Sequence, residues 1–429
     1  MMTTTTTTPA TTTTPATATR IATTQADTLQ RTPWAGAADE AELEHWRGVA
    51  RSVAERLAAD VLERDRANRN PVAEAGLLRA SGLVNLLVPA EFGGGGAHFE
   101  TAFETVRILA AADGSVSQLL AYHYFNQAGI GFYADPADQP AWWRRTVEGN
   151  WVWGDSVNPV DPTLVLTPDG EGYRLDGFKR FSTGSGVGDV IIVNAAVDGG
   201  PEHGKVLAFV LETGREGLEL VGDWDHLGQR LTASGSVRYT DVPVRPADVL
   251  GEITDEPIAT LLTPGVQLGF GNFYLGVAQG ALAQGRELLL ARRNTWFLST
   301  AETYAHDVVF QRTLGELKAR TAAVEALAEK LNRRFDAEVA LSSALTAAQR
   351  GDYAVAIAEL KVVATEVGVE VANRIYEVTG ASSASNAVGL DRYWRNVRTH
   401  TLHDPVDYKK IEVGAYFLHG ELQPLSLYT

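Results

Sequence analysis

The chain has 429 residues, a formal net charge of −16, 45% apolar and 21% charged residues, and no cysteine. This composition is typical of a soluble globular protein with about two or three structural units. Its acidic charge argues against non-specific binding of nucleic acid or of an anionic membrane. The missing cysteines exclude disulfides and thiolate metal sites, and no metal site is predicted. No apolar run approaches the roughly 20 residues of a membrane span, and no secretory signal is visible, which favours a cytoplasmic location.

Residues 1–36 are dominated by Thr, Ala and Pro, with almost no bulky apolar side chains. Such a segment cannot bury enough surface to offset the entropy lost on ordering, so we predict a disordered leader. A transit peptide is only weakly indicated, because Arg20 and Arg31 are its only basic residues.

Residues 37–150 have the periodicity of helices. Apolar residues from Leu43 to Val61 repeat at spacings of three and four, a second helix begins at Pro71, and a third begins at Phe99. The run of four glycines at 93–96 predicts a turn with positive φ or a close backbone approach. Asp113 is expected to cap a fourth helix, so this part of the chain is predicted to be a helical domain.

Residues 151–255 change to short β-like runs separated by Asp-Gly turns, beginning with Trp151-Val152-Trp153. This spacing predicts a small antiparallel β domain, either a barrel or a sandwich. Residues 256–429 return to helix. Three long apolar stripes, starting near Phe270, Leu314 and Leu360, predict an antiparallel helical bundle. The expected fold class is therefore α+β, in the order helices, sheet, bundle.

The segment 391–410 gathers two histidines, His400 and His403, ahead of Asp404-Pro405. We expect Asp404 to be an N-cap, with Pro405 at the first helical position. Histidine exchanges a proton near neutral pH, so the pair is a candidate for acid–base chemistry. The residues alone are equally consistent with a well-capped helix that carries two structural histidines.

This order of elements, with its motifs, resembles the acyl-CoA dehydrogenase fold, and in particular its flavin-dependent monooxygenase branch of dibenzothiophene and alkyl-sulfone monooxygenases. The resemblance rests on Leu86-Leu87-Val88-Pro89-Ala90-Glu91-Phe92-Gly93-Gly94, Ala112-Asp113-Gly114-Ser115, Lys179-Arg180-Phe181-Ser182-Thr183-Gly184, Asp223-Trp224-Asp225-His226-Leu227-Gly228-Gln229-Arg230 and Tyr393-Trp394-Arg395-Asn396-Val397-Arg398-Thr399-His400-Thr401-Leu402-His403-Asp404-Pro405. It implies a flavin between the β domain and the helices, and a homotetramer built through the C-terminal helices.

The branch implies that reduced flavin and O2 form a C4a-hydroperoxyflavin, with His403 as the candidate proton source and His400 in support. The dehydrogenases carry a base Glu followed by Gly-Thr near the position of Asp404, and that Glu-Gly-Thr is absent here. Its absence favours an oxygenase. An acyl-CoA dehydrogenase with Asp404 as base and a non-catalytic flavin-binding protein remain as alternatives.

The resemblance also assigns binding residues. Ser182 and Thr183 are expected against the flavin ring, where a hydroxyl can hydrogen-bond to N5; a plain strand-end turn is the alternative. Asp155 stands where the family has Asn, which favours a changed substrate if it is not simply a solvated turn residue. The other predicted cofactor contacts are Trp153, Phe181 and Trp224 near the ring, and Arg292, Gly380, Ala381 and Ser382 near the phosphate across a subunit interface. Predicted substrate contacts are Tyr122, His123 and Asn126.

No glycine motif has the context of a nicotinamide site. Electrons are therefore expected to arrive as reduced flavin, FMN in preference to FAD, from a separate NAD(P)H-dependent reductase. The predicted function is oxygenation of a small apolar organosulfur or aromatic heterocyclic substrate.

Overall fold

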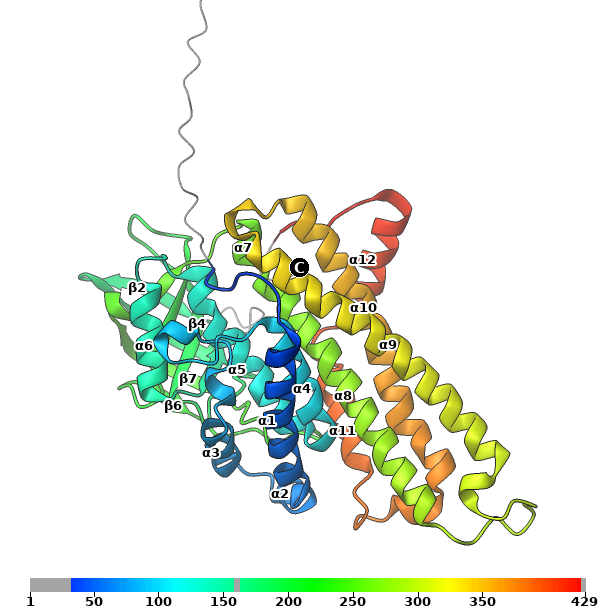
Figure 1. The fold of residues 1–429 in the computed structure, drawn as a ribbon. Helices are drawn as coiled ribbons and strands as arrows, with labels where there is room; N and C mark the ends of the chain where they lie inside the picture. Colours follow the sequence, from blue (N-terminus) through cyan, green and yellow to red (C-terminus); the bar gives the residue numbers. More distant parts are fainter. Residues whose placement is uncertain (1–31, 158–162, 426–429) are drawn as a thin grey trace, which may run out of the picture.

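The structure is a computed structural model that describes residues 32–157 and 163–425, and it has three parts in chain order (Figure 1). The first part is helical. It comprises α1 (Glu40–Ala58), α2 (Val61–Ala67), α3 (Val72–Ala80), α4 (Phe99–Ala112), α5 (Gly114–Tyr133) and α6 (Gln139–Gly149), with short 3₁₀ turns at Leu83–Asn85 and Ala90–Phe92.

The glycine run that follows these turns is a close backbone approach, as the sequence predicts. A Cβ on Gly94 would lie 2.2 Å from the carbonyl oxygen of Val88, and Gly93 has φ 90°. The predicted cap also forms, because the Oδ1 of Asp113 accepts hydrogen bonds from the backbone N–H groups of Ser115 and Val116. The first predicted helix, however, is two helices, since the chain turns at Asp60 between α1 and α2.

The second part is a sandwich of two four-stranded sheets. Its strands are β1 (Trp153–Ser156), β2 (Val165–Asp169), β3 (Gly172–Lys179), β4 (Val190–Ala196), β5 (Val206–Glu212), β6 (Leu218–Leu220), β7 (Val237–Val244) and β8 (Val249–Glu252). The sheets have the orders β1-β4-β5-β8 and β2-β3-β7-β6. The prediction of an antiparallel domain holds for every strand pair except β1 and β4, which run parallel.

The strand β4 shows how the sandwich joins the helices. Ile191 and Val193 belong to the core between the two sheets, whereas Val190 and Ile192 pack with the helical core on the opposite face. Because successive side chains of a strand point to opposite faces, a strand buried on both faces is apolar throughout. The sheet containing β1 therefore lies between the second sheet and the helices, next to α5.

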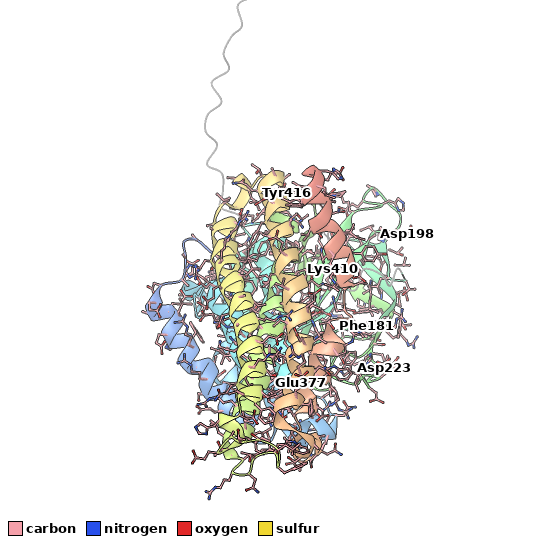
Figure 2. All side chains as sticks on the ribbon, turned by 90° about the vertical axis from the view of Figure 1, so that its right-hand side faces the viewer. Phe181, Asp198, Asp223, Glu377, Lys410 and Tyr416 are labelled. Carbon is pink, nitrogen blue, oxygen red and sulfur yellow. The ribbon has the colours of Figure 1, made fainter. Side chains whose placement is uncertain are left out.

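The third part is the helical bundle. It comprises α7 (Pro257–Thr260), α8 (Leu262–Ala291), α9 (Val308–Ala340), α10 (Ala347–Thr379), α11 (Asp391–His400) and α12 (Val406–His419), so the predicted α+β architecture is confirmed. The helices α8 and α10 run side by side through the bundle (Figures 1 and 2). Among the described helices, none is long and apolar enough to cross a membrane.

The predicted leader extends too far. Residues 1–31 lie outside the described part of the chain, but Thr32 and Trp34 are buried. The indole Nε1 of Trp34 donates to the Leu87 carbonyl oxygen at 2.9 Å, and the ring packs edge-on against Phe99. One large aromatic side chain contributes enough apolar burial to order its neighbours, which a count of residue types over the whole segment does not reveal.

Candidate active site

Two histidines lie where α11 ends. His400 is its last residue and is buried, with its Nδ1 3.0 Å from the hydroxyl of Tyr274 on α8. His403 follows in the turn before α12 and is an exposed residue. The two rings are 5.8 Å apart and nearly parallel. Phe270 of α8 packs edge-on against both, at 4.5 Å from His400 and 5.1 Å from His403.

Both imidazoles are uncharged at neutral pH. Burial lowers the pKa of His400 well below its usual value. The ring of His403 reaches solvent, but the protein around it removes enough water to lower its pKa to about 4, with the positive charge of Lys361 adding to the effect. A neutral imidazole offers one N–H donor and one acceptor nitrogen. His400 keeps a buried Nε2 that has no partner among the described residues, so its hydrogen-bonding capacity is unused.

Asp404 does not cap α12, which corrects the sequence prediction. Pro405 occupies the N-cap position and makes no side-chain cap bond. The Oδ2 of Asp404 instead lies 2.5 Å from the Nζ of Lys361 on α10. A charge-assisted contact with a buried ammonium group is stronger than a hydrogen bond to a backbone N–H, so the ion pair takes the carboxylate.

The three predicted substrate residues on α5 have different environments. Tyr122 stacks on Phe270 at 5.8 Å, and its ring is 6.3 Å from His403, so it shares the aromatic wall of the histidines. In contrast, His123 is a core residue. Its Nε2 lies 2.7 Å from the Val84 carbonyl oxygen, and its Nδ1 accepts a hydrogen bond from the Trp153 backbone N–H.

Both nitrogens of His123 are therefore occupied by backbone, and burial lowers its pKa to about 4. The side chain of Asn126 donates to the Trp153 carbonyl oxygen at 3.5 Å. These two residues hold β1 onto α5, which differs from the substrate contact expected for them. Trp153 itself is fully buried, and its indole Nε1 has no partner among the described residues.

The predicted ring-binding residues lie together where β1 meets residues 181–183. The backbone N–H of Thr183 donates to Oδ1 of Asp155 at 3.0 Å, and the Asp155 N–H donates back to the Thr183 carbonyl oxygen. The hydroxyl of Ser182 donates to that of Ser156 at 3.1 Å, and the hydroxyl of Ser234 donates to that of Thr183 at 3.0 Å. Strand β1 and this turn thus present a cluster of hydroxyls around one carboxyl group.

Asp155 is not the solvated turn residue that the sequence allowed. It is only 2% exposed, and burial raises its pKa well above the usual value. The hydrogen bond from the Thr183 backbone lowers the pKa, but by less than burial raises it. A buried carboxyl group without a cationic partner is neutral, because desolvation disfavours the charged form. Burial also raises the pKa of Tyr122 well above its usual value, and Asp155 adds to that rise.

An exposed aromatic group borders this cluster. Phe181 has φ 60° and is 51% exposed, and its ring lies 6.3 Å from that of Trp224. Trp224 stacks on His226 at 3.7 Å. The segment is joined to α11, because the Gln229 backbone N–H donates to the side chain of Asn396 at 2.8 Å. Figure 2 shows Phe181 on the sheet side of the molecule, next to the C-terminal helices.

The predicted phosphate residues form a separate group. Arg292 at the end of α8 donates to the hydroxyl of Ser382, and a Cβ on Gly380 would lie 2.9 Å from its guanidinium. Ala381 starts the 3₁₀ turn after α10. Figure 1 places this end of the bundle away from the sheets, so one chain does not bring the two groups of predicted flavin contacts together.

Sequence reasoning missed Tyr274, Phe270 and Lys361 as neighbours of the histidines. The two aromatic residues were assigned to a core stripe, where they also belong. Lys361 carried a usable signal, because it follows Leu360 inside the apolar stripe of a long helix. A lysine at such a position is rarely buried without a partner.

Family models agree with this architecture. The N-terminal domain of acyl-CoA dehydrogenases matches residues 39–150, and their C-terminal domain matches residues 268–408. The chain therefore belongs to the acyl-CoA dehydrogenase family.

Within that family it is a flavin-dependent monooxygenase. A probable FMNH2-dependent monooxygenase, SfnC, from Pseudomonas putida is 36% identical over 89% of this chain and 96% of its own. A dibenzothiophene monooxygenase from Mycolicibacterium goodii is 37% identical over 86% of this chain and 93% of its own. The structure of TdsC from Paenibacillus sp. A11-2 with FMN and indole is 34% identical, covers 90% of this chain and 100% of its own, and superimposes with a TM-score of 0.85.

The neutral state of Asp155 predicts a pH-dependent effect on stability. An unfolded Asp has a pKa near 3.9, so burying this carboxyl lowers the free energy of unfolding increasingly as pH rises above about 3.9. We expect Asp155→Asn to raise the free energy of unfolding, and to raise it more at about pH 8 than at about pH 5.5. The gain should grow by no more than ~1.4 kcal/mol for each unit of increase in pH. Denaturant midpoints at the two pH values measure it. The exposed control Asp255→Asn should show no such trend. An equal gain at both pH values would contradict a neutral Asp155.

Proposed function

We propose that this protein is a two-component monooxygenase. It takes reduced FMN from a separate NAD(P)H-dependent flavin reductase and uses O2 to oxygenate a small apolar organosulfur or aromatic heterocyclic compound. The observation that carries the proposal is the exposed, uncharged imidazole of His403, placed against Tyr122 and Phe270 and backed by His400. FMN is preferred to FAD because the named relatives use or bind FMN. The missing cysteines agree with a cytoplasmic setting, where a reductase has NAD(P)H.

The residues of this chain fit a flavin on two counts. Buried ring N atoms of His400 and Trp153 have no partners among the described residues, and the hydroxyls of Ser182 and Thr183 lie in one turn beside Asp155. Bound reduced FMN would supply the electrons that activate O2.

In that site the hydroxyls of Ser182 and Thr183 would hold the ring by hydrogen bonds. Phe270 and Tyr122 keep water from the reacting atoms. His403 would deliver a proton from one ring nitrogen while its other nitrogen takes one up from solvent, so that the ring stays neutral, with His400 holding the orientation of the pair.

Two features support the substrate class. The wall beside His403 consists of aromatic rings, which suit a flat apolar molecule. The neighbouring acid, Asp155, is uncharged, so no ionised group of that cluster opposes an apolar guest. Dibenzothiophene and indole are the compounds named for two relatives, and both are flat heterocycles.

A dehydrogenase with Asp404 as its base is disfavoured. The carboxylate is held by Lys361 at 2.5 Å, and an ion-paired carboxylate is not free to remove a substrate proton. An acyl-CoA should therefore fail to bleach protein-bound oxidised flavin.

Incubation of the pure protein with a flavin reductase, NADH, FMN and either dibenzothiophene or indole tests the proposal. We expect an oxygenated product that requires the protein, the reductase and O2. Hydrogen peroxide as the sole product with both compounds would contradict the proposed substrate class.

His403→Ala tests the role of the imidazole and separates an enzyme from a flavin-binding protein. Loss of general acid catalysis typically costs about 10²–10⁴-fold, so product should fall by at least ~10²-fold while peroxide formation continues. Thermal midpoint and flavin binding should stay unchanged, because the ring is exposed. His203→Ala, in an exposed turn, is the matched control and should retain full activity. Undiminished product from His403→Ala would exclude the assignment.

We further propose that the enzyme is a homotetramer in which Arg292 and Ser382 of one subunit meet the flavin phosphate of another. Large apolar side chains are exposed in the loop after α8 and on α12: Trp296, Phe297 and Leu298, and Tyr408, Ile411, Phe417 and Leu418. Patches of this kind mark protein–protein contacts. Light scattering should give four times the 46.2 kDa chain mass, and a monomer would overturn the assembly.

Arg292→Ala should weaken FMN binding by at least ~tenfold, because a guanidinium contributes bidentate, charge-assisted hydrogen bonds to phosphate. Fluorescence titration with FMN measures the change. Arg51→Ala on α1 removes an equal but exposed charge and should leave the affinity unaltered. Riboflavin, which lacks the phosphate, should bind wild type and Arg292→Ala alike. Equal weakening for FMN and riboflavin would contradict a phosphate contact.

A further inference from the structure

Lys361 is a buried cation in the middle of the helical bundle. It lies on α10, and its side chain is 2% exposed. Its Nζ contacts two oxygens, Oδ2 of Asp404 and Oε1 of Gln267, each at 2.5 Å. Burying an ammonium group is costly even when it is paired, and an apolar residue of similar size often serves stability as well or better. The position of Lys361 is therefore not explained by packing alone.

The surroundings of Lys361 connect it to His403. Asp404 is the next residue after His403, so the ion pair attaches the histidine-bearing turn to α10. The Nζ also lies 5.8 Å from the centre of the Phe270 ring, which packs against His403 and His400. One lysine thus contacts both the backbone neighbour of His403 and the ring that borders it.

The turn has few other restraints of comparable strength. The His403 backbone N–H donates to the His400 carbonyl oxygen at 3.0 Å, and Leu402 is exposed. Asp404 makes no cap bond to α12. Among the described contacts of residues 401–405, the ion pair of Asp404 with Lys361 is therefore the polar side-chain contact that reaches another helix.

We propose that Lys361 is a positioning residue for His403: through its ion pair with Asp404 it fixes the turn that presents the imidazole. This inference rests on the proposed function, in which His403 is the proton donor. The ammonium of Lys361 opposes a positive charge on His403, whereas the carboxylate of Asp404 favours that charge. The ammonium, together with the removal of water by the protein around the ring, outweighs the effect of the carboxylate on the pKa of His403.

The charged and titratable groups around this pair come from each packed element. They are Tyr122 on α5, Tyr274 on α8, Lys361 on α10, His400 on α11, Asp404 in the turn, and Lys409 and Glu412 on α12. Lys409 and Glu412 pair with each other at 2.8 Å, so their effects on Lys361 oppose one another. The two tyrosines stay protonated because burial raises their pKa values. Lys361 and Asp404 pair only with each other in this set, and they are the charges that act on His403.

Removing Lys361 should change the titration of His403 in a definite direction. Without the ammonium, the imidazolium loses a repulsive neighbour, and Asp404 is left as an unpaired carboxylate beside it. Both changes raise the pKa of His403, and a nearby opposite charge typically shifts a pKa by about 1–3 units. His403 should then gain a proton within the pH range in which the wild-type ring stays neutral.

Carbethoxylation by diethylpyrocarbonate, followed by peptide mass spectrometry, reads this titration in the full-length protein because the reagent attacks only neutral imidazole. Between about pH 5 and 8 the rate at His403 should be flat in wild type. In Lys361→Met it should fall at least ~threefold toward the acid end. Lys361→Arg keeps the charge and should restore the flat profile. His203, which is exposed, is an internal reference in the same digest.

Asp404→Asn separates the two roles of the pair. It leaves the ammonium in place, so the His403 profile should stay flat. It also loosens the turn, and misplacing a catalytic group by about 1 Å is expected to lower product formation roughly tenfold or more. If Lys361→Met does not fold, Lys361→Gln retains hydrogen-bonding ability without charge and carries the same test.

A Lys361→Met profile that superimposes on that of wild type, or a wild-type His403 that titrates near pH 6.5, would overturn the inference. The modification is measured on the resting protein without flavin or substrate. A failure of the proposed oxygenation would therefore leave this measurement intact, and the two proposals can fail independently.

Discussion

The close contact between α8 and its neighbours is the constraint on which the rest of the structure depends. A Cβ on Gly276 would lie 2.3 Å from the carbonyl oxygen of Arg107, and one on Gly280 would lie 2.2 Å from that of Ala111. The backbones of α8 and α4 therefore meet directly at these two points. Phe270 and Tyr274 lie on the same helix, within two turns before Gly276, so this contact also fixes the rings that surround His400 and His403.

The histidine site joins three parts of the chain that are distant in sequence. α8 contributes the aromatic wall, α11 and the following turn contribute the imidazoles, and α5 contributes Tyr122. The hydroxyl cluster on the sheet side is attached to the same α5, since His123 and Asn126 hold the backbone of Trp153. The helix α5 is thus the element that relates the two halves of the candidate site, and the satisfied core histidine serves that link.

The local features of the fold could be predicted from the sequence, whereas its long-range pairings could not. Helical periodicity located α8, α9 and α10, and Asp113 was recognised as a cap because capping depends on residues only two or three positions away. The parallel pairing of β1 with β4 was missed, because strand direction depends on topology and not on residue type. The burial of Trp34 was missed for a similar reason, since its partners lie more than fifty residues away.

The same distinction applies to the site. Spacing predicted that His400 and His403 would lie together, but it assigned Asp404 to a local cap, since no local rule includes a lysine 43 residues earlier. The residues of the chain allow Asp155 either a solvated or a buried state, and only its tertiary packing and its contact with Thr183 decide between them. Residue types therefore indicated the chemistry, while tertiary packing determined the charge state of each group.

Those charge states have a common pattern. On the sheet side, burial keeps the carboxyl of Asp155 protonated. On the helical side, burial keeps the imidazole of His400 neutral, and local desolvation with a nearby cation keeps that of His403 neutral. The full charges of this region lie behind the aromatic wall, in the pair of Lys361 and Asp404. Electrostatic interactions are strong where water is excluded, so an ionised group facing the site would bind water and oppose an apolar guest. With the charges set behind Phe270, the site offers N–H and O–H donors without a net charge. This arrangement suits the delivery of one proton beside a wall of aromatic rings.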